Sequence, residues 1–188
     1  MTARACPASA RRTGRAAQAA GDDAETVIES QAVAWCRKHG GDVARMATPV
    51  RRVGPSTGAT FRAVWVGQAP VDFVGVLPGG RAVYAELKTT GGASAPLEVH
   101  GAPLVRPEQV ARLMACRAAG GVAVVLLRLQ PAAGERWFCL PVEAWVSVVA
   151  DAERAGRASV PLAALVEAGW EFSRARPWLD CLFAPEQR

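Results

Sequence analysis

The feature that most constrains this fold is an almost unbroken apolar run from Val122 to Leu129. The run has the length of one strand, follows the pair Gly120-Gly121, and is interrupted only by Arg128. Apolar residues at consecutive positions, without alternation, are typical of a strand that is buried on both faces. The run therefore predicts a central strand in a sheet that helices cover.

Apolar spacing, together with glycine and proline, predicts the other elements. Helices are predicted at 22–38, 107–118, 141–155 and 161–168, and strands at 43–53, 61–66, 71–77, 81–89, 122–129 and 136–140. Residues 54–58 are predicted to form a loop and residues 91–101 a flexible segment. This order indicates an α/β or α+β sheet with helices packed on it.

The two ends differ from the middle in composition. Residues 1–20 contain arginines but no acid, and no large apolar residue follows Met1. Such a segment cannot bury enough apolar surface to fold, so we expect a disordered basic tail. Residues 21–180 are expected to form a single domain, and residues 181–188 a C-terminal tail.

Charge and cysteine usage narrow the function classes. The chain has 22 Lys and Arg against 17 Asp and Glu, a net charge of +5, which suits a polyanionic partner. Its five cysteines are widely spaced without a Cys-x-x-Cys pair, which favours a reducing compartment, the cytoplasm. No apolar stretch is long enough for a membrane span or a secretory signal.

The residues with the clearest chemical pattern lie on a predicted hairpin, strands 71–77 and 81–89 around Pro78-Gly79-Gly80. If the turn centres on Gly79, Asp72 lies directly opposite Glu86, with Cβ atoms about 5 Å apart. Lys88 points to the same face as Glu86, because strand side chains alternate. The opposite face is expected to carry Val71, Phe73, Leu77, Val83, Ala85 and Leu87.

Two adjacent carboxylates repel each other unless a cation lies between them. Oxygen ligands suit Mg²⁺, for which Mn²⁺ can substitute, and the Leu87 carbonyl could add a ligand. Asp72 and Glu86 are therefore candidate metal ligands, and Lys88 would orient water or neutralise phosphate charge. Only Lys38 and Lys88 are lysines, so position 88 favours an amine over arginine. The alternative is a surface salt bridge.

Asp72 and Glu86-Leu87-Lys88 resemble the PD-(D/E)xK nuclease signature. Further segments match in order, and this series resembles the RecU-type Holliday junction resolvases between about residues 25 and 170. The matching segments are Ala47-Thr48-Pro49-Val50, Val71-Asp72-Phe73-Val74-Gly75-Val76, Ala85-Glu86-Leu87-Lys88-Thr89, Glu108-Gln109-Val110 and Gly120-Gly121-Val122-Ala123.

The resemblance implies a restriction-endonuclease-like α/β fold with a mixed central sheet flanked by helices, which makes residues 21–180 a nuclease domain. It also implies a homodimer that depends on Mg²⁺ and resolves four-way DNA junctions by paired nicks during recombination and repair. Asp72 and Glu86 would be metal ligands and Lys88 the catalytic lysine.

The resemblance adds two residues to the predicted catalytic set. It points to Glu25 on the first helix as an additional acid, a role that Glu29 could take instead, and to Gln109 as an active-site residue. From position alone, Glu25 is equally a solvated acid of the first helical turn and Gln109 a polar residue at a helix start.

The segment from Pro49 to Asp72 is short compared with the protruding stalk of that family, so a reduced stalk is expected. Arg51, Arg52 and Arg62 flank the predicted loop and are candidate DNA contacts, because arginine binds phosphate bidentately. Ordinary solvated loop charge is the alternative.

Two other functions remain open at this point. A nuclease of the same type could cut duplex or flap DNA, which a junction-selectivity assay would distinguish. A non-catalytic DNA-binding module is the other, although such a module has no need of the complete Asp72, Glu86 and Lys88 set.

Overall fold

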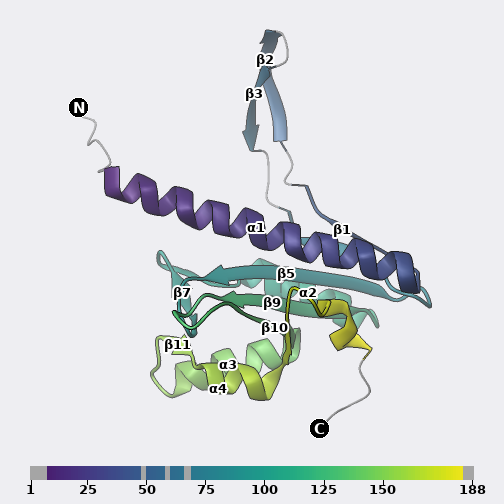
Figure 1. Ribbon diagram of the computed structural model, residues 1–188, viewed down its shortest axis with the longest axis vertical. Coiled ribbons are helices and arrows are strands. Elements are labelled where there is room, and N and C mark those ends of the chain that lie inside the picture. The colour runs from purple at the N-terminus through teal and green to yellow at the C-terminus, as the bar shows by residue number, and fades with distance from the viewer. Residues whose placement is uncertain (1–7, 48–49, 58–59, 66–68, 184–188) are drawn as a thin grey trace.

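The computed structural model describes residues 8–47, 50–57, 60–65 and 69–183, with the backbone alone at 8–19, 50–57 and 60–65. Its centre is a mixed six-stranded sheet in the order β1-β4-β5-β9-β10-β12. Figure 1 shows α1 along one face and α3 and α4 against the other. The predicted α/β architecture with a mixed sheet and flanking helices is therefore confirmed.

The helices are α1 Ala8–His39, α2 Pro107–Ala118, α3 Val142–Arg154, α4 Leu162–Ala168 and the 3-10 helix η1 Trp178–Leu182. The sheet contains β1 Asp42–Arg45, β4 Phe73–Val76, β5 Ala82–Thr90, β9 Val122–Leu129, β10 Arg136–Pro141 and β12 Trp170–Phe172. The paired strands outside it are β2 Val50–Thr57 with β3 Thr60–Trp65, β6 Ala95–Pro96 with β11 Ser159–Val160, and β7 Glu98–Val99 with β8 Ala102–Pro103.

The apolar run forms β9 with the predicted bounds, between β5 in parallel and β10 in antiparallel pairing. Its side chains alternate between two cores. Val124 and Leu126 pack on the α1 side, while Val125 and Leu127 pack on the side of α2 and α3. All four are at most 1 % exposed, which confirms the prediction of a central strand covered on both faces.

Helix α1 begins much earlier than the sequence predicted. The segment 8–20 is helical, so the expectation of a disordered tail is wrong for these residues, while residues 1–7 lie outside the described part. The sequence predicted a helix start near Asp22. Ala, Arg and Gln, which have high helix propensity, extend the helix from there towards the N-terminus. The helix is anchored by a buried stripe of Ala24, Ile28, Ala32 and Trp35.

The C-terminal tail also begins later than predicted. Trp178, Leu179 and Cys181 of η1 are at most 2 % exposed and pack in the core beside α1. An apolar side chain at each of these positions ties the short helix to the core, so residue 181 belongs to the domain.

A hairpin made by β2 and β3 stands away from the sheet (Figure 1). Its register pairs Arg52 with Ala63 and Val53 with Arg62, and shifts between Val53 and Thr57. The predicted loop at 54–58 is wrong up to Thr57, which still belongs to β2. Pro49 lies outside the described residues. The chain therefore carries a protruding two-stranded element where a reduced stalk was expected.

No helix that the structure describes has the length and apolar character needed to cross a membrane.

The pairing of β1 with β4 depends on Gly75, which lies opposite Val43. A Cβ at position 75 would lie 2.6 Å from the Val43 Cα and would also meet the Asp42 carbonyl oxygen. We therefore expect Gly75→Ala to force the strands apart and lower the free energy of unfolding by about 2 kcal/mol. Denaturant unfolding measures this, with Gly91→Ala as control, because nothing lies within 4 Å of a Cβ there. Equal stability of the two variants would contradict the prediction.

Candidate active site

The hairpin of β4 and β5 has the predicted register. Phe73 pairs with Ala85 and Val76 with Ala82, as a turn centred on Gly79 requires. This register sets Asp72 beside Glu86, although Asp72 lies in a bend just before β4. Val71 is an exception, because it packs in the core on the α2 side and not with Phe73. Strand alternation does not apply in the bend, which explains the error.

β5 is longer than its neighbour, and this difference opens the edge of the sheet. Pairing with β4 ends at Ala85, so the next residues of β5 have no strand partner on that side. The Asp72 Oδ2 accepts a hydrogen bond of 2.8 Å from the Leu87 N–H. The Asp72 carbonyl in turn accepts one of 2.8 Å from the Met46 N–H, directly after β1. Asp72 is thereby fixed between β1 and β5.

Glu86 is the most constrained acid of the cluster. Its side chain is fully buried, and its Oε1 accepts hydrogen bonds from the Lys88 Nζ at 2.6 Å and from the Gln109 Nε2. Its Oε2 is buried without a hydrogen-bond partner among the residues described. Burial, followed by repulsion from Asp72, raises the pKa of Glu86 to about 7, although Lys88 acts in the opposite direction. One carboxylate oxygen therefore lacks the partner that burial normally demands.

Gln109 joins this cluster from α2. Its Oε1 accepts a 3.0 Å hydrogen bond from the Arg106 N–H, so the amide both caps the helix and holds Glu86. The apolar spacing of this helix predicts one face with Val110, Leu113, Met114 and Arg117. The buried side instead consists of Gln109, Leu113 and Cys116, and Met114 is 40 % exposed. The helix is rotated so that its polar third residue, and not only its apolar residues, faces the sheet.

Glu25 approaches from α1, on the other side of the sheet edge. It forms an ion pair with Arg45 of β1. Burial raises the pKa of Glu25, Arg45 lowers it, and the charge of Asp72 raises it further, which indicates that Glu25 lies within electrostatic range of Asp72. Glu29 is exposed, so the structure favours Glu25 as the acid beside Asp72.

The structure therefore brings together the five predicted catalytic residues at one open edge of the sheet. Sequence reasoning missed Arg45, which pairs with Glu25, and Arg106, which anchors Gln109. Arg106 precedes Pro107, and proline is common at the first position of a helix, so its capping position could have been recognised. Nothing in the sequence indicates the partner of Arg45.

The predicted DNA contacts lie on the protruding hairpin. Arg51 and Arg52 belong to β2 and Arg62 to β3, and their side chains are outside the described part of the structure. The hairpin leaves the sheet after Met46, whose N–H bonds to Asp72. The chain that leads towards the hairpin therefore passes Asp72.

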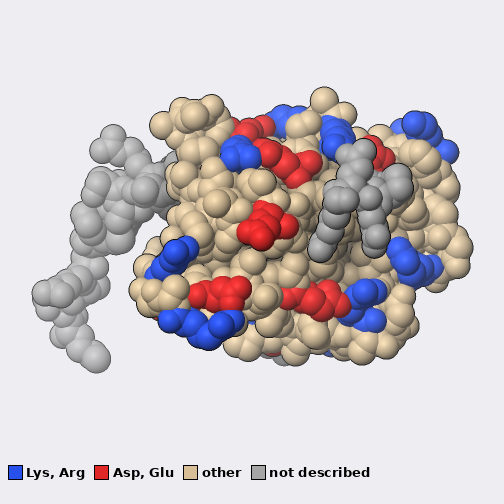
Figure 2. Space-filling view, turned by 90° about the horizontal axis from the view of Figure 1, so that it is seen from below, with Lys and Arg blue, Asp and Glu red and all other residues tan. Residues whose placement is uncertain are grey.

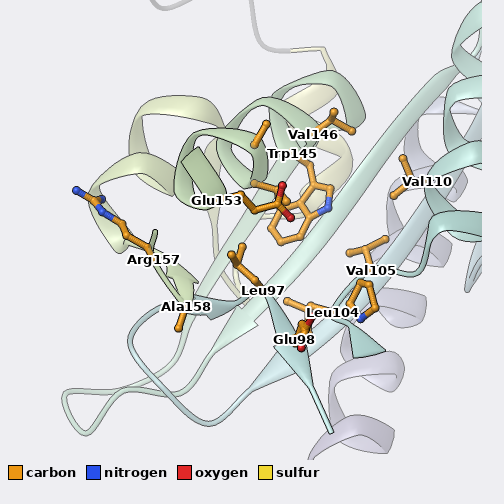
Figure 3. A pocket seen from close by; sticks show the side chains of 13 residues that line it. Leu97, Glu98, Leu104, Val105, Val110, Trp145, Val146, Glu153, Arg157 and Ala158 are labelled. Atoms are coloured by element: carbon orange, nitrogen blue, oxygen red, sulfur yellow. The ribbon is translucent and has the colours of Figure 1, made fainter. Parts of the chain in front are cut away.

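The face of the molecule formed by α3 and α4 has its own pattern of charge. Figure 2 shows acidic groups in the middle of this face and basic groups mostly nearer its margin. A hollow of about 590 Å³ lies between α3 and the segment 97–105, lined by apolar residues such as Trp145 and Val146 together with Glu98 and Glu153 (Figure 3). None of the candidate catalytic residues lines this hollow.

Within residues 8–47, 50–57, 60–65 and 69–183, no group of three or more His, Cys, Asp or Glu is arranged to hold a metal ion. The candidate donor set is smaller and consists of Asp72, Glu86 and the Leu87 carbonyl. Oxygen ligands of this kind suit Mg²⁺, which usually binds through one or two carboxylates and keeps several waters. The unpartnered, buried Oε2 of Glu86 fits a cation as its missing partner.

No protein-family model matches this chain, and no curated protein matches it.

Proposed function

We propose that this protein is a Mg²⁺-dependent DNA endonuclease of the PD-(D/E)xK type, with a restriction-endonuclease-like fold, and that it resolves Holliday junctions as a homodimer. The observation that carries the proposal is the environment of Glu86. It is fully buried beside Asp72, with Lys88 and Gln109 on one oxygen and no described partner on the other. A structural salt bridge needs no second acid and leaves no orphaned oxygen.

Asp72, Glu86 and the Leu87 carbonyl would hold the ion, with Mn²⁺ as a substitute for Mg²⁺. The chemistry that such an ion supplies is Lewis-acid activation of water and of the phosphodiester. The Leu87 N–H fixes the orientation of Asp72, and the Gln109 amide fixes that of Glu86. Both carboxylates are therefore oriented before any ligand arrives, which lowers the cost of reorganisation.

Lys88 has the position of a group that acts on the substrate. Its side chain is one-fifth exposed, between the buried Glu86 and solvent. The amine can donate to an attacking water or to a phosphate oxygen while Glu86 holds it. Glu25 adds a third acid near Asp72 from α1, and Arg45 limits the resulting repulsion.

The hairpin of β2 and β3 supports a branched substrate over a plain duplex. It stands off the sheet, and the chain leading towards it passes Asp72, so in this proposal it enters the opening between the arms of a four-way junction. Arg51, Arg52 and Arg62 on this hairpin would contact the backbone of the DNA. Cys36, Cys116, Cys139 and Cys181 are free thiols, which supports a cytoplasmic location.

The test is incubation of the purified protein with a labelled four-way junction and with a linear duplex of the same arms, each with Mg²⁺, Mn²⁺ or EDTA. We expect paired cuts in the junction only, and their loss with EDTA and in Asp72→Asn. Cutting of the linear duplex at the same rate would replace the junction with the other nuclease function. An uncut junction over a range of metals and pH would leave only DNA binding.

A further inference from the structure

A second hollow, of about 390 Å³, lies between α2 and the start of β5. Arg81 and Tyr84 line it from the strand side and Arg112 and Ala115 from α2. The remaining lining residues include several glycines and alanines, so the hollow has low walls. We refer to it as the Tyr84 groove.

Both walls of the Tyr84 groove, β5 and α2, also carry residues of the candidate active site. Tyr84 and Glu86 are two residues apart on β5, so they share a face and lie about 7 Å apart along the strand. On α2, Arg112 follows Gln109 by three residues, which makes the two neighbours on the helix surface. The groove therefore begins one step away from Glu86 and leads away from it between β5 and α2.

The charge of the Tyr84 groove is positive and unneutralised. Arg81 and Arg112 are exposed, and neither forms an ion pair with any acid that the structure describes. Arg117 and Arg136, in contrast, pair with Glu143 and Glu171. No described acid lines this groove, whereas the hollow in Figure 3 has Glu98 and Glu153 in its wall.

We propose that the Tyr84 groove binds the sugar-phosphate backbone of the strand being cut, on one side of the scissile phosphate. Arg81 and Arg112 would contact successive phosphates, and the Tyr84 ring would pack against the intervening sugar. The acids of the active site repel a polyanionic substrate. Two guanidiniums that pair with none of the described acids can attract its phosphates. The inference rests on the proposed function, because it takes Glu86 as the point of cleavage.

The experiment compares Arg81→Glu, Arg112→Glu and the double variant with Arg157→Glu. Arg157 is an exposed arginine in the wall of the other hollow, so its reversal changes the net charge as much as either single variant does. Binding of a fluorescent four-way junction is measured in EDTA at several salt concentrations. We expect the double variant to bind at least tenfold more weakly, with the slope of log K against log salt reduced by about one per arginine. Arg157→Glu should stay within about twofold of wild type.

Two further variants distinguish a lost contact with DNA from a loss of folding. Arg81→Gln with Arg112→Gln removes charge without adding acid, and circular dichroism checks that it folds. Ala115→Phe fills the groove without any change of charge. Both should raise KM in Mg²⁺ and leave kcat unchanged, because they act on substrate binding outside the cleavage site.

The outcomes are distinct. If wild type cuts the junction while the double variant binds and cuts as well as Arg157→Glu, the groove proposal is overturned and the nuclease stands. If wild type does not cut but the groove variants still lose binding and salt slope, the groove stands as a site for the DNA backbone and the proposed function fails. A fall in kcat at unchanged KM would also overturn the groove proposal.

Discussion

Replacement of Glu86 by glutamine is expected to abolish DNA cleavage while making the metal-free protein more stable at neutral and alkaline pH. The loss of activity follows because an amide cannot serve as a charged ligand for Mg²⁺. Metal chemistry is worth several kcal/mol in a transition state, so cleavage should fall by about a thousandfold or more. A substitution that stabilises the fold and abolishes cleavage is expected where an acid is buried for catalysis at a cost in stability.

The sign of the stability change follows from the pKa of Glu86. Folding raises this pKa from 4.5 to about 7, because burial and Asp72 disfavour the charged form. Between these values the folded protein retains a proton that the unfolded chain has released, so stability falls as pH rises. Well above pH 7 both states are charged and the full cost, roughly 3 kcal/mol, is present. A neutral glutamine amide at this position has no such cost.

The measurement is urea unfolding of both proteins in EDTA from pH 5 to pH 8.5. The advantage of Glu86→Gln should be under about 1 kcal/mol at pH 5 and reach about 3 kcal/mol at pH 8. Glu98→Gln, at an exposed position, serves as the control. An advantage that is equal at both ends of the range would refute the role of a buried charge, and a variant that still cuts would remove Glu86 from the catalytic set.

Two parts of the site were predictable because short-range rules determine them. The turn at Gly79 and Gly80, both with positive φ, fixes the register of the hairpin, and this register sets Asp72 beside Glu86. Strand periodicity then gives Lys88 the same face as Glu86. Both inferences use contacts between residues less than about twenty positions apart, where turn chemistry and alternation leave few options.

The contacts of the two helices were not predictable by the same rules. Whether Gln109 reaches Glu86 depends on the rotation of α2 about its axis. The apolar pattern of 107–118 does not place Gln109 on the buried face, where the structure has it. Whether Glu25 or Glu29 approaches Asp72 depends on how far α1 is shifted along the sheet. These are packing outcomes of the whole core, and only the resemblance pointed to these residues from the sequence.

Arg128 is the residue whose role is hardest to predict from the sequence. It interrupts the apolar run, yet its side chain is only 7 % exposed. Its guanidinium binds Glu135 at 2.7 Å and Asp23 at 3.0 Å, donates to the Ala20 carbonyl at 3.0 Å, and lies 5.1 Å from the centre of the Trp137 ring. It therefore ties α1 to the sheet two residues before Glu25.

Arg128→Met is expected to lower the free energy of unfolding. Methionine fills much of the same volume, but it leaves Asp23 and the half-buried Glu135 without this cation. Hydrogen bonds to charged groups contribute about 1.5 to 3 kcal/mol each. Because both acids are partly exposed and Arg174 still pairs with them, we expect a loss of about 2 kcal/mol. Arg136→Met breaks an exposed pair with Glu171 and should cost under about 1 kcal/mol.

The pH dependence of the stability difference between wild type and Arg128→Met distinguishes a loss of ion pairing from a loss of packing. Arg174 and Arg128 lower the pKa of Glu135 from 4.5 to about 2. The stability that this pairing contributes is present above pH 4.5 and is lost as pH falls through 2. The gap between wild type and Arg128→Met should therefore narrow as the pH of the unfolding experiment falls from 6 to 2. A gap that stays constant over this range would mean that the arginine acts through packing alone. If the gap narrows and Mg²⁺-dependent cleavage also falls at pH 7 in the folded variant, the ion pair holds α1, and with it Glu25, against the active site.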